Sequence, residues 1–236
     1  MPDPDILIRG ADGKDGVKGD DAPNASEPLN PNGKDGVYDK DKTPECVSAD
    51  NGKDGLNASE NGGPGEDGFP GQSAFEFILQ CGSLELETPL VIASAGGKGG
   101  NAGPGGQGGD GSNGGNAGQQ AKKCTSLPLM RGGVGGNGSN GGDAGVAAEG
   151  GNGGAIAVFY RDSNLDLPVE ASSVGAAGGT GAKGGGEGSG GKGGLNGSDP
   201  DKTRTHAADG TGGRPGKGSK GGKGGHGGPI EIRKEE

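Results

Sequence analysis

Glycine recurs with a period of three residues over four long blocks of this sequence. In residues 96–119, eight consecutive triplets have Gly or Ala at the first position, Gly at the second position in all but one, and mostly polar residues at the third. Blocks 132–155, 175–198 and 209–229 repeat this pattern, and residues 10–21 carry a weaker version with one Gly per triplet. Any fold of this chain therefore has to use glycine at regular intervals along several segments.

A period of three favours an extended left-handed helix with three residues per turn and a rise of about 3.1 Å per residue. Such a helix makes no internal hydrogen bonds, so each backbone N–H and C=O group needs a partner outside it. Glycine leaves edges without side chains, and neighbouring backbones can then approach closely enough to bond. We therefore expect glycine to form the packing surface. Triplets with two Gly favour an interior position, and triplets with one Gly favour the periphery.

Three other structures compete with this interpretation. Collagen also has a three-residue period, but it needs long Gly-X-Y runs rich in Pro, and Pro is sparse here. Residues 105–113 match the start of a calcium-binding β-roll repeat, but Ser112 stands where an apolar residue belongs and no tandem copies follow. Only 26% of residues are hydrophobic, which is also typical of disordered chains. The periodicity argues against disorder.

With these glycine blocks, the sequence resembles the polyglycine II bundle proteins. Known members include springtail antifreeze proteins and the glycine-rich tip adhesins of some phage long tail fibres. The resemblance covers about half of the chain, and it rests on the Gly-Gly-X triplets alone. It implies an architecture but says little about function.

Short segments of alternating apolar residues lie between the glycine blocks, and following the chain direction places nearly all of them at one end. Residues 80–83 and 161–164 look like hairpin turns within pairs of these segments. The predicted fold class is mostly non-regular and β: an antiparallel bundle of about six polyglycine II helices with a small β-sheet or β-sandwich head at one end. The whole chain, 1–236, is predicted to be a single composite domain, with head strands at 6–9, 74–94, 155–172 and 229–233 and glycine-rich helices at 10–21, 52–72, 96–118, 132–154, 175–197 and 210–228.

The net charge of −10 is unevenly distributed, since residues 1–72 hold 16 acidic and 7 basic residues. An acidic N-terminal third argues against nucleic acid as the partner. No signal peptide or membrane-spanning run is visible, so we expect no membrane insertion and, by default, a cytoplasmic or virion component. The last block carries a basic row at its third positions, from Arg214 to Lys223. One alternative is that this basic row pairs with the acidic first block. The other is that both rows are solvated faces.

No motif for catalysis, metal binding or a cofactor stands in a suitable context, so we expect a protein that is not an enzyme, with no catalytic, metal or cofactor site. The candidate recognition residues lie in loops at the end away from the head: Tyr38, Lys40, Lys42, Lys122, Lys123, Lys202, Arg204 and His206. Cys46 and Cys124 fall in loops at this same end and form a candidate disulfide if the setting is oxidising. Cys81 is expected at the opposite end.

These features favour a non-enzymatic structural or binding module, a rod that presents loops for recognition or attachment, either adhesin-like or part of an assembly. Its expected partner is a protein or a polar surface receptor, bound by a monomer or by a larger assembly. Ice binding is the alternative implied by the springtail proteins, but the third positions mix Lys, Asn, Gln, Asp and Val and offer no ladder of Thr or Ala. A regulatory partner or substrate of a cytosolic enzyme is the third alternative.

Overall fold

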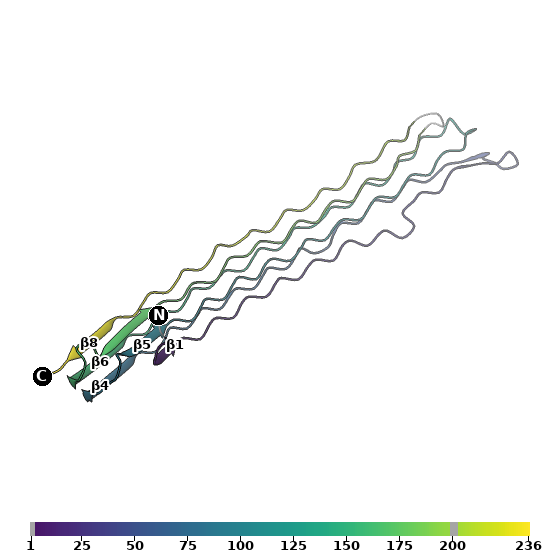
Figure 1. Cartoon of the computed structure of the whole chain (residues 1–236). Helices are drawn as coiled ribbons and strands as arrows, with labels where there is room; N and C mark the ends of the chain where they lie inside the picture. The colour runs from purple at the N-terminus through teal and green to yellow at the C-terminus, as the bar shows by residue number, and fades with distance from the viewer. Residues whose placement is uncertain (1–2, 199–202) are drawn as a thin grey trace.

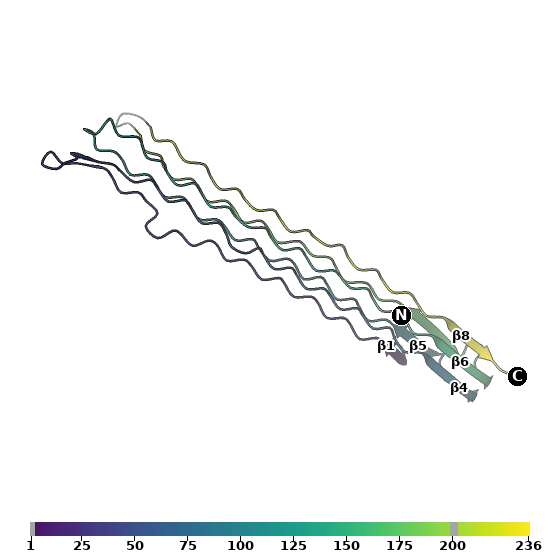
Figure 2. The same ribbon diagram turned by 180° about the vertical axis from the view of Figure 1, so that it is seen from behind.

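The chain is elongated, with the strands β1 and β4–β8 at one end and loops at the other (Figure 1). This computed structural model describes residues 3–198 and 203–236. Long glycine-rich segments connect the two ends, and the view from behind shows the same arrangement (Figure 2). The strands are β1 (Ile6–Arg9), β2 (Val37–Tyr38), β3 (Cys46–Val47), β4 (Phe77–Leu84), β5 (Leu90–Ala95), β6 (Ile156–Ser163), β7 (Val169–Val174) and β8 (Ile230–Lys234).

The six glycine-rich segments lie in two layers of three, which we call the slab. In chain order they are segment 1 (10–36), segment 2 (49–74), segment 3 (96–119), segment 4 (131–155), segment 5 (175–197) and segment 6 (205–228). Segments 1, 3 and 5 form the odd layer, and segments 2, 4 and 6 form the even layer. Neighbours within a layer run parallel, because Gly13 N–H donates to the Lys98 carbonyl at 2.7 Å and Gly16 N–H to the Asn101 carbonyl at 2.8 Å. Neighbours in opposite layers run antiparallel, because Gly142 N–H donates to the Gly106 carbonyl at 2.8 Å and Gly145 N–H to the Gly103 carbonyl at 2.9 Å.

Each segment has three rows of residues, because its hydrogen bonds repeat every three positions. The outer row points to solvent on the slab face. The cross row donates its N–H groups to the preceding segment in the other layer, as Gly142 does. The lateral row donates its N–H groups to the next segment of the same layer, as Gly138 of segment 4 does to the Thr211 carbonyl of segment 6. The backbone bonds of the slab are therefore made between segments rather than within them.

Glycine in the two inner rows is required by close backbone approach. A Cβ on Gly96, in the lateral row of segment 3, would overlap the Gly151 carbonyl of segment 4 in the other layer. A Cβ on Gly97, in a cross row, would overlap the Ala11 carbonyl of the preceding segment in the same layer. No glycine among the described residues has a positive φ. Glycine serves here to let backbones touch, as the triplet pattern predicts, and not to allow an unusual backbone conformation.

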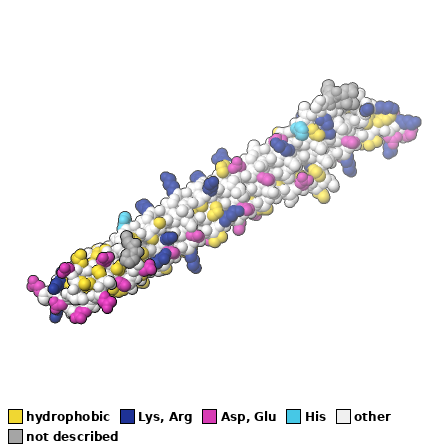
Figure 3. All heavy atoms as spheres, in the orientation of Figure 1, with side chains coloured by type: hydrophobic (Ala, Val, Ile, Leu, Met, Phe, Trp, Pro, Cys, Tyr) yellow, Lys and Arg dark blue, Asp and Glu magenta, His cyan; other side chains and the backbone are white. Residues whose placement is uncertain are grey.

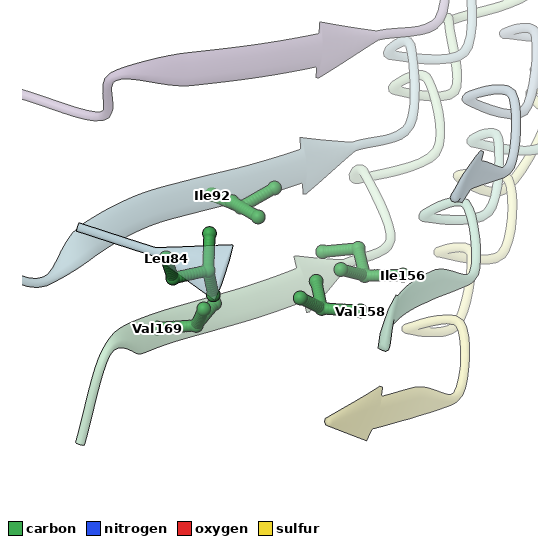
Figure 4. Close-up of a cluster of buried hydrophobic side chains, with 5 residues drawn as sticks. All are labelled: Leu84, Ile92, Ile156, Val158 and Val169. Carbon is green, nitrogen blue, oxygen red and sulfur yellow. The ribbon is translucent and has the colours of Figure 1, made fainter. Parts of the chain in front are cut away.

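At one end the slab continues into two three-stranded sheets. The odd layer extends into a sheet of order β1-β5-β7 and the even layer into a sheet of order β4-β6-β8, and every pairing in both is parallel. The core between the sheets is small, and Figure 4 shows its five buried side chains together. They are Leu84, Ile92, Ile156, Val158 and Val169.

The predicted fold class is wrong. We expected an antiparallel bundle of polyglycine II helices, but residues 3–198 and 203–236 contain no helix, and their regular structure consists of strands in small sheets. The glycine-rich segments are extended chain whose N–H groups bond to neighbouring segments, so no helical bundle is formed. Neighbours within each layer also run parallel rather than antiparallel, because every second segment leaves the strands in the same direction.

The two predicted hairpins are also wrong. Residues 80–83 lie inside β4, and Arg161, Asp162 and Ser163 of the second predicted turn belong to β6. The chain turns instead at 85–89 and 164–168, where it passes from the even-layer sheet to the odd-layer sheet. This crossing is required because segment 2 and segment 3 lie in different layers. Consecutive strands therefore face each other across the core and do not pair.

The acidic row of segment 1 and the basic row of segment 6 do not pair. The parallel bonds run from segment 1 to segment 3 to segment 5 and from segment 2 to segment 4 to segment 6. Segments 1 and 6 consequently lie at opposite edges of the slab (Figure 1). Of the two alternatives left by the sequence, pairing between these rows is excluded.

Candidate functional site

The tip is the end of the slab away from the sheets, and it holds the loop residues that the sequence singled out. One loop is a short hairpin in which β2 pairs antiparallel with β3, Val37 facing Val47 and Tyr38 facing Cys46. The other loop, residues 119–131, joins segments 3 and 4 and is folded by short turns such as Cys124 N–H to the Ala121 carbonyl at 2.8 Å. Both loops are therefore placed by the ends of bonded segments.

A disulfide and one side-chain amide join the two loops. Cys46 of the hairpin is bonded to Cys124 of the second loop, 78 positions away in sequence, and Cys124 is 1% exposed. The Gln120 side chain accepts a bond from Ala49 N–H at 3.1 Å and donates one to the Pro128 carbonyl at 2.9 Å. Cys81 lies at the other end of the molecule, on β4. The tip is thus one connected unit and not two independent loops.

Exposed lysines surround this unit. Lys123 holds its Nζ 4.9 Å from the centroid of the Tyr38 ring, a cation–π contact worth about 0.5–1 kcal/mol at an exposed site. Lys42 pairs with Asp39 at 3.4 Å within the hairpin. Lys40 and Lys122 are exposed. The structure therefore brings Tyr38 and four lysines from two distant loops into one polar surface.

The remaining predicted residues are placed differently. Arg204 turns inward, and its guanidinium donates to the Asn196 and Ala117 carbonyls at 2.7 and 2.6 Å. His206 Nδ1 lies 2.9 Å from the Gly193 carbonyl oxygen and must donate to it, because a carbonyl oxygen only accepts. Both side chains hold segments 3, 5 and 6 together near the tip. Lys202 lies outside the described residues.

Sequence reasoning missed Gln120 and the outer-row carboxylates and amides. Along the slab, Asn, Asp and Gln side chains accept bonds from the outer-row N–H of the next segment in the layer, for example Asp143 Oδ1 from Lys217 N–H at 2.7 Å. The recurrence of Asn and Asp at every third position was the signal for this ladder. A lone Gln in a loop carried no comparable signal.

Three carboxylates are held in their charged form by such contacts. The Lys98 N–H lowers the pKa of Asp12, with a smaller contribution from Arg9. The Lys18 ammonium and then the Gln107 N–H lower the pKa of Asp21. The Gly193 N–H and then Lys192 lower the pKa of Asp209. A lowered carboxyl pKa is the reverse of what a general acid needs at neutral pH.

The described residues contain two notable hollows and no group of side chains suited to a metal ion. The tip pocket, beside Lys122, Cys124 and Leu127, has a volume of about 140 Å³, whereas small-molecule sites usually measure about 300–1,000 Å³. A larger hollow of about 370 Å³ lies open on the face of the even layer, beside Asn61 and Arg214. Within 3–198 and 203–236, no three His, Cys, Asp or Glu side chains are grouped to hold a metal ion. No helix in that part of the chain could cross a bilayer.

Comparisons with known proteins do not place the chain in a family. No protein-family model and no curated protein matches it. Among solved structures, it is 26% identical to a springtail antifreeze protein from Granisotoma rainieri, described as a nine polyproline type II helical bundle; the match covers 72% of this chain and 95% of that chain. The TM-score is 0.09, so this likeness carries no argument about fold or function. The expected resemblance to tail-fibre adhesins stays a prediction.

Proposed function

We propose that this protein is a non-enzymatic structural and binding module, in which the glycine-rich slab presents its tip to a polar surface receptor. The observation that carries this proposal is the disulfide-linked tip, where Cys46 and Cys124 join two loops beside Tyr38 and Lys123. Loops fixed on a rigid scaffold are the usual place for recognition residues. The receptor chemistry that suits four exposed lysines and one aromatic ring is an anionic, polar surface.

The slab itself supports presentation rather than chemistry. Its inner rows are closed by backbone bonds every three residues, and its outer rows carry charged and amide side chains of mixed kind (Figure 3). Ice binding remains the alternative suggested by the sequence, but no observation on the slab favours it. A flat row of small, weakly apolar side chains is absent from the outer row of segment 4, where Asn140, Asp143 and Glu149 are exposed.

The test uses immobilised polygalacturonate as an anionic surface and dextran as a neutral one. We expect the protein to bind polygalacturonate and not dextran. Changing Lys40, Lys122 and Lys123 to Ala should weaken binding at least tenfold, because these lysines belong to the tip. The matched control changes three slab lysines, Lys217, Lys220 and Lys223, to Ala.

Two outcomes would contradict the proposal. One is a wild-type protein that binds neither surface, or whose binding depends on the slab lysines more than on the tip lysines. The other is measurable thermal hysteresis in the wild-type protein, which would favour ice binding instead.

A further inference from the structure

Each inner row needs glycine only where a neighbouring segment lies against it. In segments 1 and 2, no preceding segment of the same layer exists, and the cross rows hold large residues such as Lys14, Val17 and Phe69. In segments 3 to 6 such a neighbour exists. There a Cβ on Gly133 or Gly210 would overlap a backbone carbonyl, of Lys53 or Gly136 respectively. Glycine in an inner row therefore indicates that the backbone of another segment lies against that row.

Segment 6 departs from this rule. The described chain contains no segment beyond it, so its lateral row should tolerate side chains as the cross row of segment 1 does. Yet this row carries Gly212, Gly218, Gly221 and Gly224, interrupted by Pro215 and preceded by Asp209. A Cβ at these four positions would meet no atom nearer than 3.4, 3.2, 3.2 and 3.4 Å. Packing within the chain requires these glycines far less than it requires Gly210 or Gly133, whose Cβ atoms would overlap a backbone carbonyl oxygen.

The same edge leaves backbone groups unbonded in a regular pattern. Lateral-row N–H groups of segment 3 donate to segment 5, for example Gly99 to the Ala177 carbonyl. The corresponding N–H groups of Gly178, Gly181 and Gly184 in segment 5 have no partner in the described part of the chain. The cross-row carbonyls of segment 6 are likewise unbonded there, whereas those of segment 4 accept from segment 5. The open edge, as we call this side of segments 5 and 6, offers bonds for one more layered pair of segments.

The open edge is also basic. In Figure 3, Lys and Arg side chains project along the upper edge, where Figure 1 places segment 6. Successive lysines in an outer row are about 9 Å apart, three residues at about 3.1 Å each. Charge complementarity calls for an acidic neighbour. The basic outer-row residues are Lys183 and Lys192 in segment 5 and Arg214, Lys217, Lys220 and Lys223 in segment 6.

A second copy of this chain does not fit the open edge. Two open edges related by a two-fold axis would make neighbours within a layer run antiparallel, whereas the bonds of each layer join parallel segments. The edge formed by segments 1 and 2 has the right direction of bonds and acidic outer rows, but Lys14, Val17 and Phe69 occupy the row that would contact segments 5 and 6. A flexible peptide is disfavoured because ordering each residue costs about 1–2 kcal/mol, more than the roughly 0.5–1.5 kcal/mol of each bond formed.

We propose that the open edge binds the ordered edge of another glycine-rich protein, one whose contacting row is glycine and whose outer rows are acidic. The partner adds two segments that run parallel to segments 5 and 6. It also continues the two sheets beyond β7 and β8, which are the outermost strands on this side. This surface is separate from the tip, so the inference does not depend on the proposed recognition role.

The test uses a surrogate partner made from this chain. The surrogate replaces the large cross-row residues of its first edge by glycine and carries Gly218→Val and Gly221→Val, which block its own open edge. We expect it to form a 1:1 complex with the wild-type protein in sedimentation velocity, at least tenfold weaker in 0.5 M than in 0.05 M salt because the edges are oppositely charged. The residues changed to glycine are Lys14, Val17, Asp20, Lys53, Leu56, Glu66, Phe69 and Gln72.

Two variants of the wild-type partner provide matched controls. Gly218→Val with Gly221→Val should abolish the complex while the protein still folds, since the added Cβ atoms would stand 3.2 Å from the Ala182 and Gly179 carbonyl oxygens and need only a small shift of segment 6. Gly82→Val adds the same side chain on β4, where a Cβ meets nothing within 4 Å, and should leave the complex unchanged. A complex that survives Gly218→Val with Gly221→Val, or no complex with a folded surrogate, overturns the proposal. Equal binding of the flexible peptide (Gly-Gly-Asp)8 also overturns it, because no ordered partner is then needed.

A second measurement applies if the surrogate does not fold. A copy of residues 164–197, with its two lysines changed to Asp, is appended after Glu236 so that the added segment reaches the open edge from the strand end. Amide hydrogen exchange at Gly178, Gly181 and Gly184 should slow at least tenfold relative to the wild-type protein. Unchanged exchange at all three amides overturns the proposal.

Discussion

Segments 1 and 6 occupy equivalent places at the two edges of the slab, yet their sequences differ. Each contacts two other segments, one in its own layer and one in the other layer. Segment 1 has one Gly per triplet and fills its free side with Lys14, Val17 and Asp20. Segment 6 has two Gly in most triplets and leaves its free side bare except at Asp209 and Pro215. The difference teaches that the number of Gly residues per triplet indicates how many sides of a segment are suited to contact another backbone. We call the edge formed by segments 1 and 2 the finished edge, because large side chains cover its free side, in contrast to the open edge.

The largest expected effect comes from adding a side chain between inner segments. Gly106→Val and Gly142→Val should each lower the free energy of unfolding by about 3–5 kcal/mol, because the new Cβ overlaps the Asp20 or Gly63 carbonyl and separates bonds on both sides. The outer-row changes Gln107→Val and Asp143→Val should lose about 1 kcal/mol or less, since only a solvent-exposed side-chain bond disappears. Thermal unfolding followed by circular dichroism measures all four.

Gly218→Val is the matched control at the open edge. We expect a change within about 0.5 kcal/mol, as for other surface substitutions. If all five variants unfold at the same temperature, glycine does not set the packing of the slab and the comparison between the two edges fails.

The tip disulfide should have the next largest effect. It ties the hairpin that follows segment 1 to the loop between segments 3 and 4, so it restrains the finished edge and not segment 6. Changing Cys46 and Cys124 to Ser should lower stability by about 2–4 kcal/mol in an oxidising buffer, because a long loop is no longer closed in the unfolded chain. Hydrogen exchange should quicken near Tyr38 and Gln120. Equal quickening in segment 6 would show that the bond acts on the whole slab.

Opening the finished edge should change assembly. Replacing by Gly the eight residues that the surrogate replaces should cost about 0.5 kcal/mol each through chain entropy. The variant keeps its own open edge, so copies should add side by side in a head-to-tail series that does not close. Light scattering should then rise with protein concentration for this variant and not for the wild-type protein. A variant that stays monomeric would mean that bulk in these rows is not what finishes the edge.

The smallest expected effect concerns pH. The folded-state pKa values of Asp12 and Asp21 are lowered, so their contribution to stability is present above the ordinary carboxyl pKa of about 3.8 and is lost as the pH falls through the lower folded values. Melting temperature should therefore decline below about pH 4. Asp12→Asn with Asp21→Asn should decline less over this range. An unchanged decline would assign acid sensitivity to other carboxylates.

The sequence by itself determined where glycine is needed, which segments alternate apolar residues, and that the alternating segments and the loops with Cys46 and Cys124 lie at opposite ends. Those features follow from local rules, because a bare edge, an alternating strand and a polar turn each leave a short repeating pattern. It also placed Tyr38, the tip lysines and the two joined cysteines at one end. It assigned a two-Gly triplet to the interior, and segment 6 shows why that inference fails at an edge that is built to meet another backbone.

Only the tertiary structure decided the layers, the parallel sheets and the free edge. Whether residues 80–83 turn or continue as β4 depends on segments 2 and 3 lying in different layers, which no local pattern records. Gln120 and Arg204 acquire their roles from carbonyls and amides that are distant in sequence. A repeat specifies that backbones will touch, but the order in which segments touch is set by long-range hydrogen bonds. That order leaves segment 6 with glycines whose lateral side no further segment of the described chain covers.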